Sequence, residues 1–408
     1  MPGSSGGCLS VLCLLGSFYL LAGDPGGCCR KVSLQYNPGL NSSSVNLLHV
    51  RAVGCNNTLH YVWSSIGAPT ALLVYTDSES SALRVNWTKL LSPSPAGAIV
   101  VEPAGSVLYS TAVVFSRVFE YNGANTSDLT AVHEDNFYPT YDLADFSWES
   151  VNRTLNETAL SATFQGVSVS DPKGAFRNGS ISFRVTAYEE SSRDTLLPRL
   201  LHTANSSKVE FIVNRVAPRG NGSRFALEII TVEEKGGRKT LESLRSINDE
   251  YTPTIFEVAQ LVSDARNDSA GPSFLQWKAT AYSSQNAMRE DSYHCRYYPL
   301  QTANRTLPRL SIAHAYFGEA LASQHSVAAI NISFGSEDNE AYEEKGYLSW
   351  SALIGFGTPP KDTFSPLVMA IMVVALGTPV VLLVAGSFVV LLVQKKRLEE
   401  MAAKDHLA

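Results

Sequence analysis

The stretch STAVVFSRVFEY, residues 110–121, decides the fold class that we predict for this chain. It is rich in Val, Phe and Tyr, which strands favour, and it contains no Gly or Pro. Similar short runs recur between clusters of Gly, Pro, Asn and Ser, for example at 70–76, 179–189, 208–216, 224–234 and 347–356. Many short strands without intervening helical periods predict a mainly β fold, built as antiparallel sandwiches or barrel-like sheets.

One segment offers a helical alternative to strand. In TLESLRSINDE, residues 240–250, the apolar residues Leu241, Leu244 and Ile247 follow helical spacing. The segment is short and its pattern is weak, so it leaves the prediction of a mainly β fold unchanged.

The chain has 408 residues, which as a prior means two to three domains. Residues 122–157 are acidic and rich in turn residues, and strand-like sequence resumes directly after them. We therefore place a domain boundary there. The first β-rich domain covers 24–157 and ends in this long acidic connection, and the second covers 158–360.

Both ends of the chain carry an apolar run. Residues 1–23 have the pattern of a secretory signal peptide without its usual basic residue, and an uncleaved anchor is the alternative. Residues 366–393 form a transmembrane helix in this reading, because 367–393 contain no charge and exceed the thickness of a bilayer core. The basic residues that follow make 394–408 a cytosolic tail. The β-rich domains are then luminal or extracellular, anchored by one C-terminal helix in the lipid bilayer.

The predicted transmembrane helix contains small residues and one proline. Small side chains let a second helix approach closely, and a central proline kinks a helix. The candidate packing residues are Gly377, Pro379, Ala385, Gly386 and Ser387. A plain anchor is the alternative, since no G-x-x-x-G motif is present. The tail has neither a tyrosine nor a paired leucine, so it lacks an ordinary sorting signal.

Sequons for N-glycosylation are the dominant signal in the sequence. Twelve of the 21 Asn residues match N-x-[ST], where about three or four would match by chance. The candidate glycosylation sites are Asn41, Asn56, Asn86, Asn125, Asn152, Asn156, Asn178, Asn205, Asn221, Asn267, Asn304 and Asn331. Asn86 and Asn331 are the weakest candidates, because both sit in strand-like surroundings. The spread of the sequons predicts glycans over most faces of the protein.

Composition and motifs argue against most other classes of function. The net charge of −6 and the lack of a basic block before the tail argue against nucleic acid as a partner. We find no nucleophile elbow, zinc-protease motif, phosphate loop or paired C-x-x-C, and we predict no catalytic residue, metal or cofactor. His49 and His60 lie in strand-like runs and are expected to be sheet residues, not ligands. A triad assembled from distant residues stays open.

Four cysteines follow the signal peptide: Cys28, Cys29, Cys55 and Cys295. In the oxidising secretory pathway they allow three full pairings, and an unpaired thiol is also possible. The sequence does not choose among these arrangements.

Several long runs resemble one known family. They are NLLHVRAVGCNNTLHYVWSS (46–65), YDLADFSW (141–148), LSATFQG (160–166), PRLLHTA (198–204), SINDEYTPTIFE (246–257) and YLSWSALIGFGTPP (347–360). Together they resemble the glycosylated lysosomal membrane protein family, over essentially the whole part before the membrane helix and on into the helix.

The resemblance implies a non-enzymatic type I lysosomal membrane protein with a glycosylated lumenal part and a short cytosolic tail. It implies a role as accessory subunit of a lysosomal major facilitator superfamily transporter of dipeptides, which it stabilises and shields from luminal proteases. A membrane-tethered hydrolase or ligand receptor is the alternative function, and the state of self-association stays open.

Two features depart from the family pattern. The tail lacks the tyrosine-based signal of the family, so autonomous sorting is in doubt. The run after residue 204 lacks a cysteine that the family carries, which puts the usual partner of Cys295 in doubt. We therefore carry no disulfide pattern over from the family.

Overall fold

The computed structural model describes residues 29–123, 128–171, 173–234, 239–247, 255–263, 273–302, 307–318, 324–335, 342–362 and 366–405. The predicted signal peptide, Cys28 and three of the sequons lie outside these residues. The chain forms two compact units. The first, here called the β unit, runs up to Ser243 and continues over Val258–Pro360, and the second consists of Leu244–Glu257 and Lys361–Ala408.

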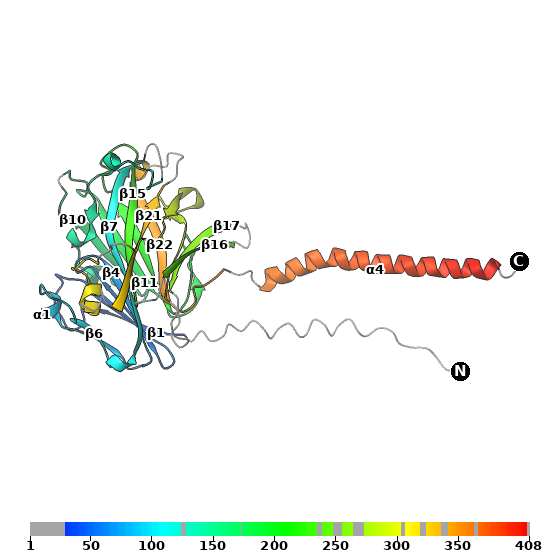
Figure 1. Cartoon of the computed structure of the whole chain (residues 1–408), viewed down its shortest axis with the longest axis horizontal. Helices are drawn as coiled ribbons and strands as arrows, with labels where there is room; N and C mark the ends of the chain where they lie inside the picture. The colour runs from blue at the N-terminus through cyan, green and yellow to red at the C-terminus, as the bar shows by residue number, and fades with distance from the viewer. Residues whose placement is uncertain are drawn as a thin grey trace. The chain divides into compact units, whose positions relative to one another are not determined.

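Strands from both ends of the β unit build its first sheet (Figure 1). Every neighbouring pair in this sheet is antiparallel. The order across the sheet is β1 (Lys31–Tyr36), β2 (Leu47–Val53), β3 (Thr58–Ser64), β4 (Thr70–Thr76), β7 (Val107–Asn122), β15 (Ser223–Glu234) and β21 (His325–Phe334).

The second sheet is antiparallel as well. Its order is β9 (Phe146–Trp148), β10 (Ser161–Ser168), β11 (Ser180–Ala187), β14 (Ser206–Asn214), β22 (Tyr347–Phe356), β18 (Ser273–Lys278) and β17 (Ile255–Ser263). Two short strands connect the sheets: β19 (Thr280–Tyr282) pairs with β22 and β20, and β20 (Ser292–Tyr297) pairs with β21.

The two sheets enclose one hydrophobic core. Alternate residues of each strand point into it, which matches the two-residue period of β structure. Its largest fully buried members include Trp277, Trp350, Phe183, Phe211 and Phe225. The prediction of antiparallel, sandwich-like β structure is confirmed.

The expected division at residue 157 does not separate two cores. The first sheet places β7, from before residue 157, next to β15, from after it. One cluster of buried side chains draws on strands from both sides of that position. In the described part of the chain, 24–157 and 158–360 therefore contribute to one sandwich.

The acidic connection is packed onto this sandwich. Tyr141 and Asp142 form the short strand β8, which pairs with Val118 and Arg117 of β7. Four apolar side chains of the connection join the main core: Tyr141, Leu143, Phe146 and Val151. Its turn-rich composition predicted a long connection, and the structure shows that the connection contains three short 3-10 helices and is anchored by these apolar residues.

A second cluster of apolar residues covers the outer face of the first sheet. It consists of side chains from β2, β3, β4, β7, β15 and β21 that point away from the main core. Helix α2 (Ile312–Phe317) and the pair β5 (Ala82–Val85) and β6 (Ile99–Glu102) pack against them. Helix α1 (Trp87–Leu90) follows β5.

The helical alternative at 240–250 is wrong where the structure describes it. Residues Lys239–Ile247 form strand β16. Thr240 Oγ1 donates to the carbonyl of Val262 in β17 at 3.4 Å, and Gln260 Nε2 donates to Glu242 Oε2 at 2.7 Å. Pairing with β17 overrides a weak local helix pattern.

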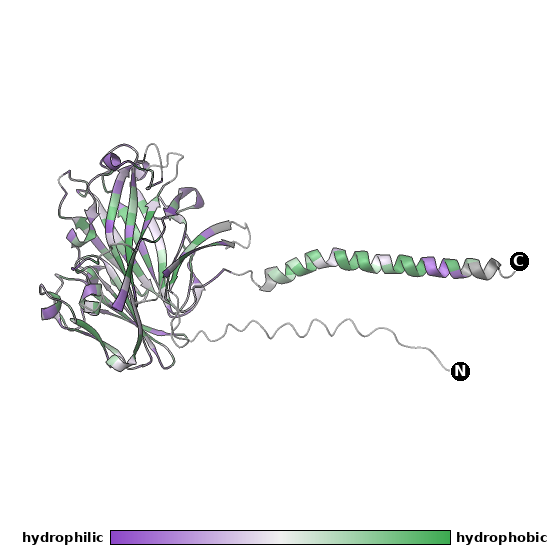
Figure 2. Ribbon diagram, in the orientation of Figure 1, coloured by the Kyte–Doolittle hydropathy of each residue, from purple (hydrophilic) through white to green (hydrophobic). Residues whose placement is uncertain are grey.

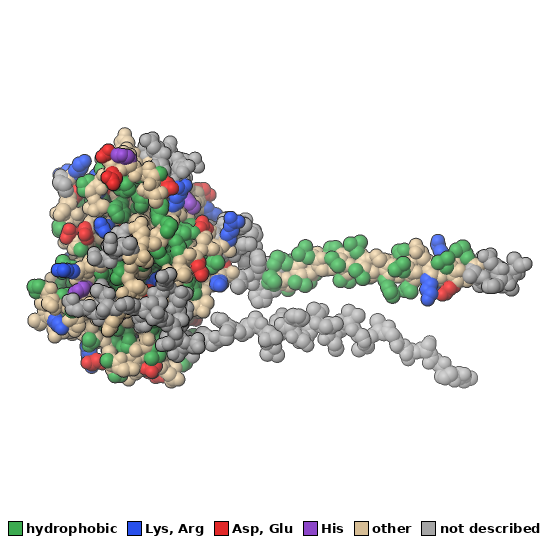
Figure 3. All heavy atoms as spheres, viewed as in Figure 1, with side chains coloured by type: hydrophobic (Ala, Val, Ile, Leu, Met, Phe, Trp, Pro, Cys, Tyr) green, Lys and Arg blue, Asp and Glu red, His purple; other side chains and the backbone are tan. Residues whose placement is uncertain are grey.

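Helix α4 (Pro366–Asp405) belongs to the second unit and continues without interruption through Pro379. Its span Met369–Glu399 contains a stretch of 18 residues with a mean hydropathy of 2.5 and is long enough to cross a membrane. Figure 2 shows the hydrophobic stretch, and Figure 3 shows apolar side chains around it followed by basic ones. The prediction of one C-terminal apolar helix is confirmed.

Candidate functional site

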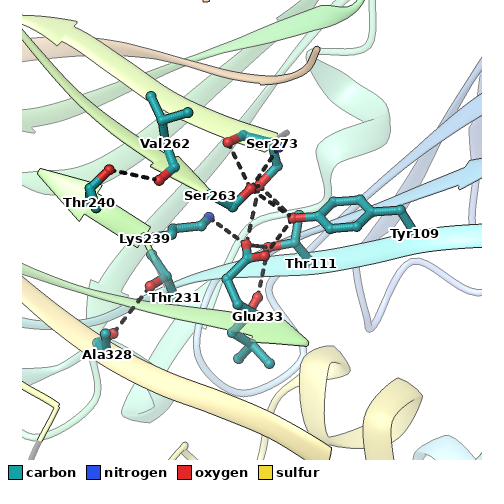
Figure 4. Close-up of polar contacts among 11 residues, drawn as sticks. Tyr109, Thr111, Thr231, Glu233, Lys239, Thr240, Val262, Ser263, Ser273 and Ala328 are labelled. Atoms are coloured by element: carbon teal, nitrogen blue, oxygen red, sulfur yellow. Dashed lines mark hydrogen bonds and ion pairs between the residues drawn. The ribbon is translucent and has the colours of Figure 1, made fainter. Parts of the chain in front are cut away.

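A buried polar cluster lies where the ends of five strands meet, and Figure 4 shows it. Its centre is the carboxylate of Glu233, near the end of β15, and we call it the Glu233 cluster. The other members are Tyr109 and Thr111 of β7, Lys239 of β16, Ser263 of β17 and Ser273 of β18. The cluster therefore joins strands of the first sheet to strands of the second.

Both oxygens of Glu233 accept hydrogen bonds. Tyr109 donates its hydroxyl to Oε2 at 2.6 Å, and Thr111 Oγ1 donates to Oε1 at 2.6 Å. Ser273 Oγ donates to Oε1 at 3.2 Å. Lys239 Nζ lies 3.0 Å from the same oxygen. Short charge-assisted bonds of this kind are the strong ones in proteins.

The charges of this cluster are almost completely removed from water. The side chains of Lys239 and Glu233 are 2% and 5% exposed. Burial, and then the charge of Glu233, raise the pKa of the Tyr109 hydroxyl well above its usual value. The phenol therefore stays a neutral donor. With so little exposed surface, the cluster is suited to fixing strands in place and not to receiving a substrate.

A second buried carboxylate, that of Glu120, bonds the acidic connection to the first sheet. Glu120 of β7 is fully buried, and Arg219 Nε donates to its Oε2 at 2.6 Å. Ser223 Oγ donates to Oε1 at 2.9 Å, and the hydroxyl of Tyr141 donates to Oε2 at 3.1 Å. The guanidinium of Arg219 also lies 4.0 Å from the centre of the Tyr141 ring, a cation–π contact.

The alternation of inward and outward residues along the strands indicates that Glu233 and Glu120 are buried, although neither belongs to a known motif. Glu233 shares the parity of Leu227 and Ile229, which point into the core, and Glu120 shares the parity of Val118. A charged residue at an inward position of a strand predicts a buried partner. The identity of that partner depends on contacts that are distant in sequence.

His49 and His60 form a hydrogen-bonded relay with Ser81. His49 Nε2 lies 2.9 Å from His60 Nδ1, and His60 Nε2 lies 2.8 Å from Ser81 Oγ. This order resembles a nucleophile, a base and an orienting group. Ser81 and His60 are 0% exposed, however, so Ser81 Oγ is closed to a substrate. The expectation that both histidines are sheet residues is confirmed.

The cysteines do not all pair. Cys55 is in a disulfide. Cys29 and Cys295 are free thiols, exposed and buried respectively. Burial raises the pKa of Cys295 well above its usual value, which keeps it an inert thiol.

Cys29 borders an open cleft of about 720 Å³, which His202 and Tyr188 also line.

Seven sequon asparagines are exposed and lie in the connections between strands of the β unit: Asn41, Asn56, Asn86, Asn152, Asn156, Asn178 and Asn221. Asn86 does not lie in a strand as expected, because it caps helix α1 and accepts from the amide of Lys89 at 3.0 Å. Asn125, Asn267 and Asn304 fall outside the described residues. The exposure of the seven is compatible with bulky glycans.

Two further sequon asparagines are half-buried. Asn205 Oδ1 accepts from Arg30 Nε at 2.6 Å, and the Asn205 carbonyl accepts from the Tyr61 hydroxyl at 2.6 Å. Asn331 lies within β21, as expected, and its Oδ1 is buried. These two positions offer less room for sugar than the other seven.

The candidate packing residues of the membrane helix all lie within α4. Thr378 Oγ1 donates to the carbonyl of Val374 at 2.6 Å, and Ser387 Oγ donates to that of Leu383 at 2.7 Å. These bonds satisfy both hydroxyls within the helix, as an apolar environment requires. The packing role of Gly377, Pro379, Ala385, Gly386 and Ser387 stays a prediction.

The chain is similar to named proteins along nearly its whole length. The sequence model of the family described as "Glycosylated lysosomal membrane protein" matches residues 46–397. "Glycosylated lysosomal membrane protein A" of Xenopus laevis is 56% identical over 368 residues, covering 90% of this chain and 91% of that protein. The Homo sapiens protein named "Glycosylated lysosomal membrane protein" is 44% identical over 368 residues, covering 90% and 89%. Its Danio rerio counterpart is 40% identical over 383 residues, covering 92% of each.

Proposed function

The chain belongs to the glycosylated lysosomal membrane protein family, and from this premise we propose that it is a non-enzymatic accessory subunit of a transporter. It stabilises a lysosomal major facilitator superfamily transporter of dipeptides and shields it from luminal proteases. The family places the chain in the lysosomal membrane, and the apolar span of α4 crosses it once.

The distribution of exposed sequons carries the proposal. Seven exposed asparagines, of which Asn152 and Asn156 share one connection, put glycans around the β unit instead of on one stalk. Proteases cut first at exposed loops, and bulky sugars keep them from reaching the backbone. A β unit coated in this way can cover the short luminal loops of a membrane partner and survive beside it.

The buried clusters support a scaffold over a catalyst. Among the described residues, the His49–His60–Ser81 relay has the order of a hydrolase site, and its serine is fully buried. No group of three or more His, Cys, Asp or Glu side chains in the described part of the chain could hold a metal ion. These observations favour the accessory subunit over the membrane-tethered hydrolase.

The half-life of the transporter tests the proposal. Cells that lack this chain should degrade the transporter faster in lysosomes, and inhibitors of luminal proteases should restore its half-life. Re-expression of the full chain should also restore it, whereas a variant with Asn→Gln at the seven exposed sequons should not. An unchanged half-life in cells that lack the chain would reject the role.

Two measurements separate the finer parts of the proposal. Purification of the full chain in mild detergent should recover a multispanning transporter, and its absence would argue against a stable complex. Dipeptide transport by the partner in liposomes, with and without this chain, then distinguishes stabilisation from participation in transport. Equal transport rates per folded transporter are expected, because one helix forms no substrate path.

A further inference from the structure

Two cysteines of the β unit lie opposite each other, one before β1 and one in the turn after β2. The two strands pair antiparallel, and Lys31 is opposite Val53 at the end of the ladder. Two further steps in the same register place Cys29 opposite Cys55. Opposite residues of an antiparallel pair have their Cα atoms about 4.5–5.5 Å apart, and a disulfide spans about 4.4–6.8 Å. The register therefore brings the two sulfur atoms within bonding distance of each other.

Contacts of Arg30 keep the two segments side by side beyond the last strand pair. Arg30 Nη1 donates to the carbonyl of Ala52 at 3.0 Å. A Cβ atom on Gly54 would lie 2.9 Å from the same nitrogen. These contacts hold Arg30 next to Gly54, so that the neighbouring residues Cys29 and Cys55 are brought together.

The two cysteines are in different redox states. Cys55 is in a disulfide, whereas Cys29 is a free thiol. Both residues are exposed, and Cys29 also borders the open cleft of about 720 Å³. A thiolate that reaches a sulfur atom of a disulfide exchanges with it. The pair therefore combines an accessible nucleophile with an accessible disulfide, which the buried thiol of Cys295 does not.

We propose that Cys29 is an exchange thiol that takes over the disulfide of Cys55. The Cys29 thiolate attacks Cys55 Sγ and forms a Cys29–Cys55 bond, and the former partner of Cys55 leaves as a thiolate. The proton that Cys29 gives up is balanced by the proton that the leaving thiolate takes up. One disulfide and one thiol are present before and after the step, so it needs no oxidant or reductant. The exchange removes the free thiol from the edge of the cleft and gives the turn after β2 a different attachment.

Mapping of thiols and disulfides in the full chain tests the exchange. The chain is purified in mild detergent without reductant and incubated at about pH 8, where thiolates are abundant. Samples are labelled with N-ethylmaleimide at intervals and digested at acidic pH. At the start, fragment ions should place the label on Cys29. With time a Cys29–Cys55 linkage should appear and a different cysteine should become labelled, while the total number of labelled thiols stays constant.

Three single variants provide the controls. Cys29→Ser should abolish the exchange and leave Cys55 in one fixed disulfide. Cys295→Ser, at the buried thiol, should exchange at the wild-type rate. Cys28→Ser removes the cysteine next to Cys29 in sequence. In this variant Cys29 should be bonded to Cys55 from the start, since its neighbour no longer competes.

Three results would overturn the proposal. The first is a wild-type chain that never forms the Cys29–Cys55 linkage, or forms it only after denaturation. The second is exchange that also brings Cys295 into disulfides, because the whole sandwich would then have to open. The third is Cys28→Ser with both Cys29 and Cys55 labelled as free thiols. If that variant does not fold, the wild-type map decides alone. The proposal does not depend on the transporter role.

Discussion

At the scale of single residues, the amide of Asn205 has a structural role that competes with its sequon. Its Oδ1 accepts from the guanidinium of Arg30, a residue only 7% exposed. Replacement by Ala leaves that buried donor without its acceptor. Hydrogen bonds to charged groups contribute about 1.5–3 kcal/mol, so we expect Asn205→Ala to lower the free energy of unfolding by about 2 kcal/mol.

Chemical denaturation of protein treated with an endoglycosidase measures this effect without a difference in sugar. The control is Asn41→Ala, at an exposed sequon in a loop, which should change the free energy of unfolding by less than about 0.5 kcal/mol. Equal effects of the two substitutions would show that the Arg30 contact contributes nothing.

The buried histidine pair makes stability depend on pH. Burial lowers the pKa of His49 to about 3, helped by His60 and Arg51, and burial lowers the pKa of His60 to about 4, helped by Arg51. Both imidazoles titrate near 6.5 in the unfolded chain. Their contribution is therefore complete above about pH 6.5 and is lost as the pH falls towards 4 and then 3.

Between pH 6.5 and pH 5 this loss amounts to about 2 kcal/mol for each imidazole. The double variant His49→Gln/His60→Gln does not titrate there, so its free energy of unfolding should change less over this range. Denaturation at a series of pH values measures the two slopes. Parallel curves for wild type and double variant would contradict the assignment.

At the scale of elements, Arg219 attaches the acidic connection to the first sheet. Its side chain is 9% exposed and its partner Glu120 is fully buried. Breaking a buried pair costs about 3–5 kcal/mol because one charge remains without compensation. Arg219→Ala should therefore lower the free energy of unfolding by about 3 kcal/mol, and a protease should cut within 128–141 faster.

The exposed pair of Arg84 and Glu102 provides the comparison for this element. Arg84→Ala should cost less than about 1 kcal/mol, since solvent already screens that pair. Denaturation and limited proteolysis of both variants give the two readouts. Normal proteolysis of Arg219→Ala would mean that the apolar residues of the connection suffice to hold it.

The elements themselves were largely predictable from local pattern. The run 70–76 coincides with β4, and 347–356 coincides with β22, because β-branched and aromatic residues stand between clear turn signals. The helical alternative at β16 was wrong because Leu241, Leu244 and Ile247 match the spacing of a helix. The strand conformation of this segment depends on its pairing with β17, which a local pattern does not reveal. The buried cluster at Glu233 was out of reach for the same reason: its donors come from residues 109, 111, 239 and 273.

At the scale of the whole molecule, chain order and spatial order differ. The turn-rich connection at 122–157 indicated two domains, yet β7 lies against β15 along ten residue pairs, from Ser223↔Asn122 to Val232↔Ala112. In the second sheet β9 pairs with β10 directly across the expected boundary. Composition marks where a chain turns, whereas long-range strand pairing decides which segments share a core.

A shared core predicts that both parts of the β unit unfold together. Removing β7 from β15 would expose Phe225, Leu227 and Ile229, which also pack against the second sheet, so neither part keeps its core alone.

Hydrogen exchange of the full chain in increasing denaturant should give one midpoint for peptides from 47–76 and from 206–214. Two separate midpoints for 47–76 and 206–214 would restore the two-domain interpretation. A single midpoint means that a cut in the connection near residue 157 leaves the two pieces associated, held by the pairing of β7 with β15 and not by the chain that joins them.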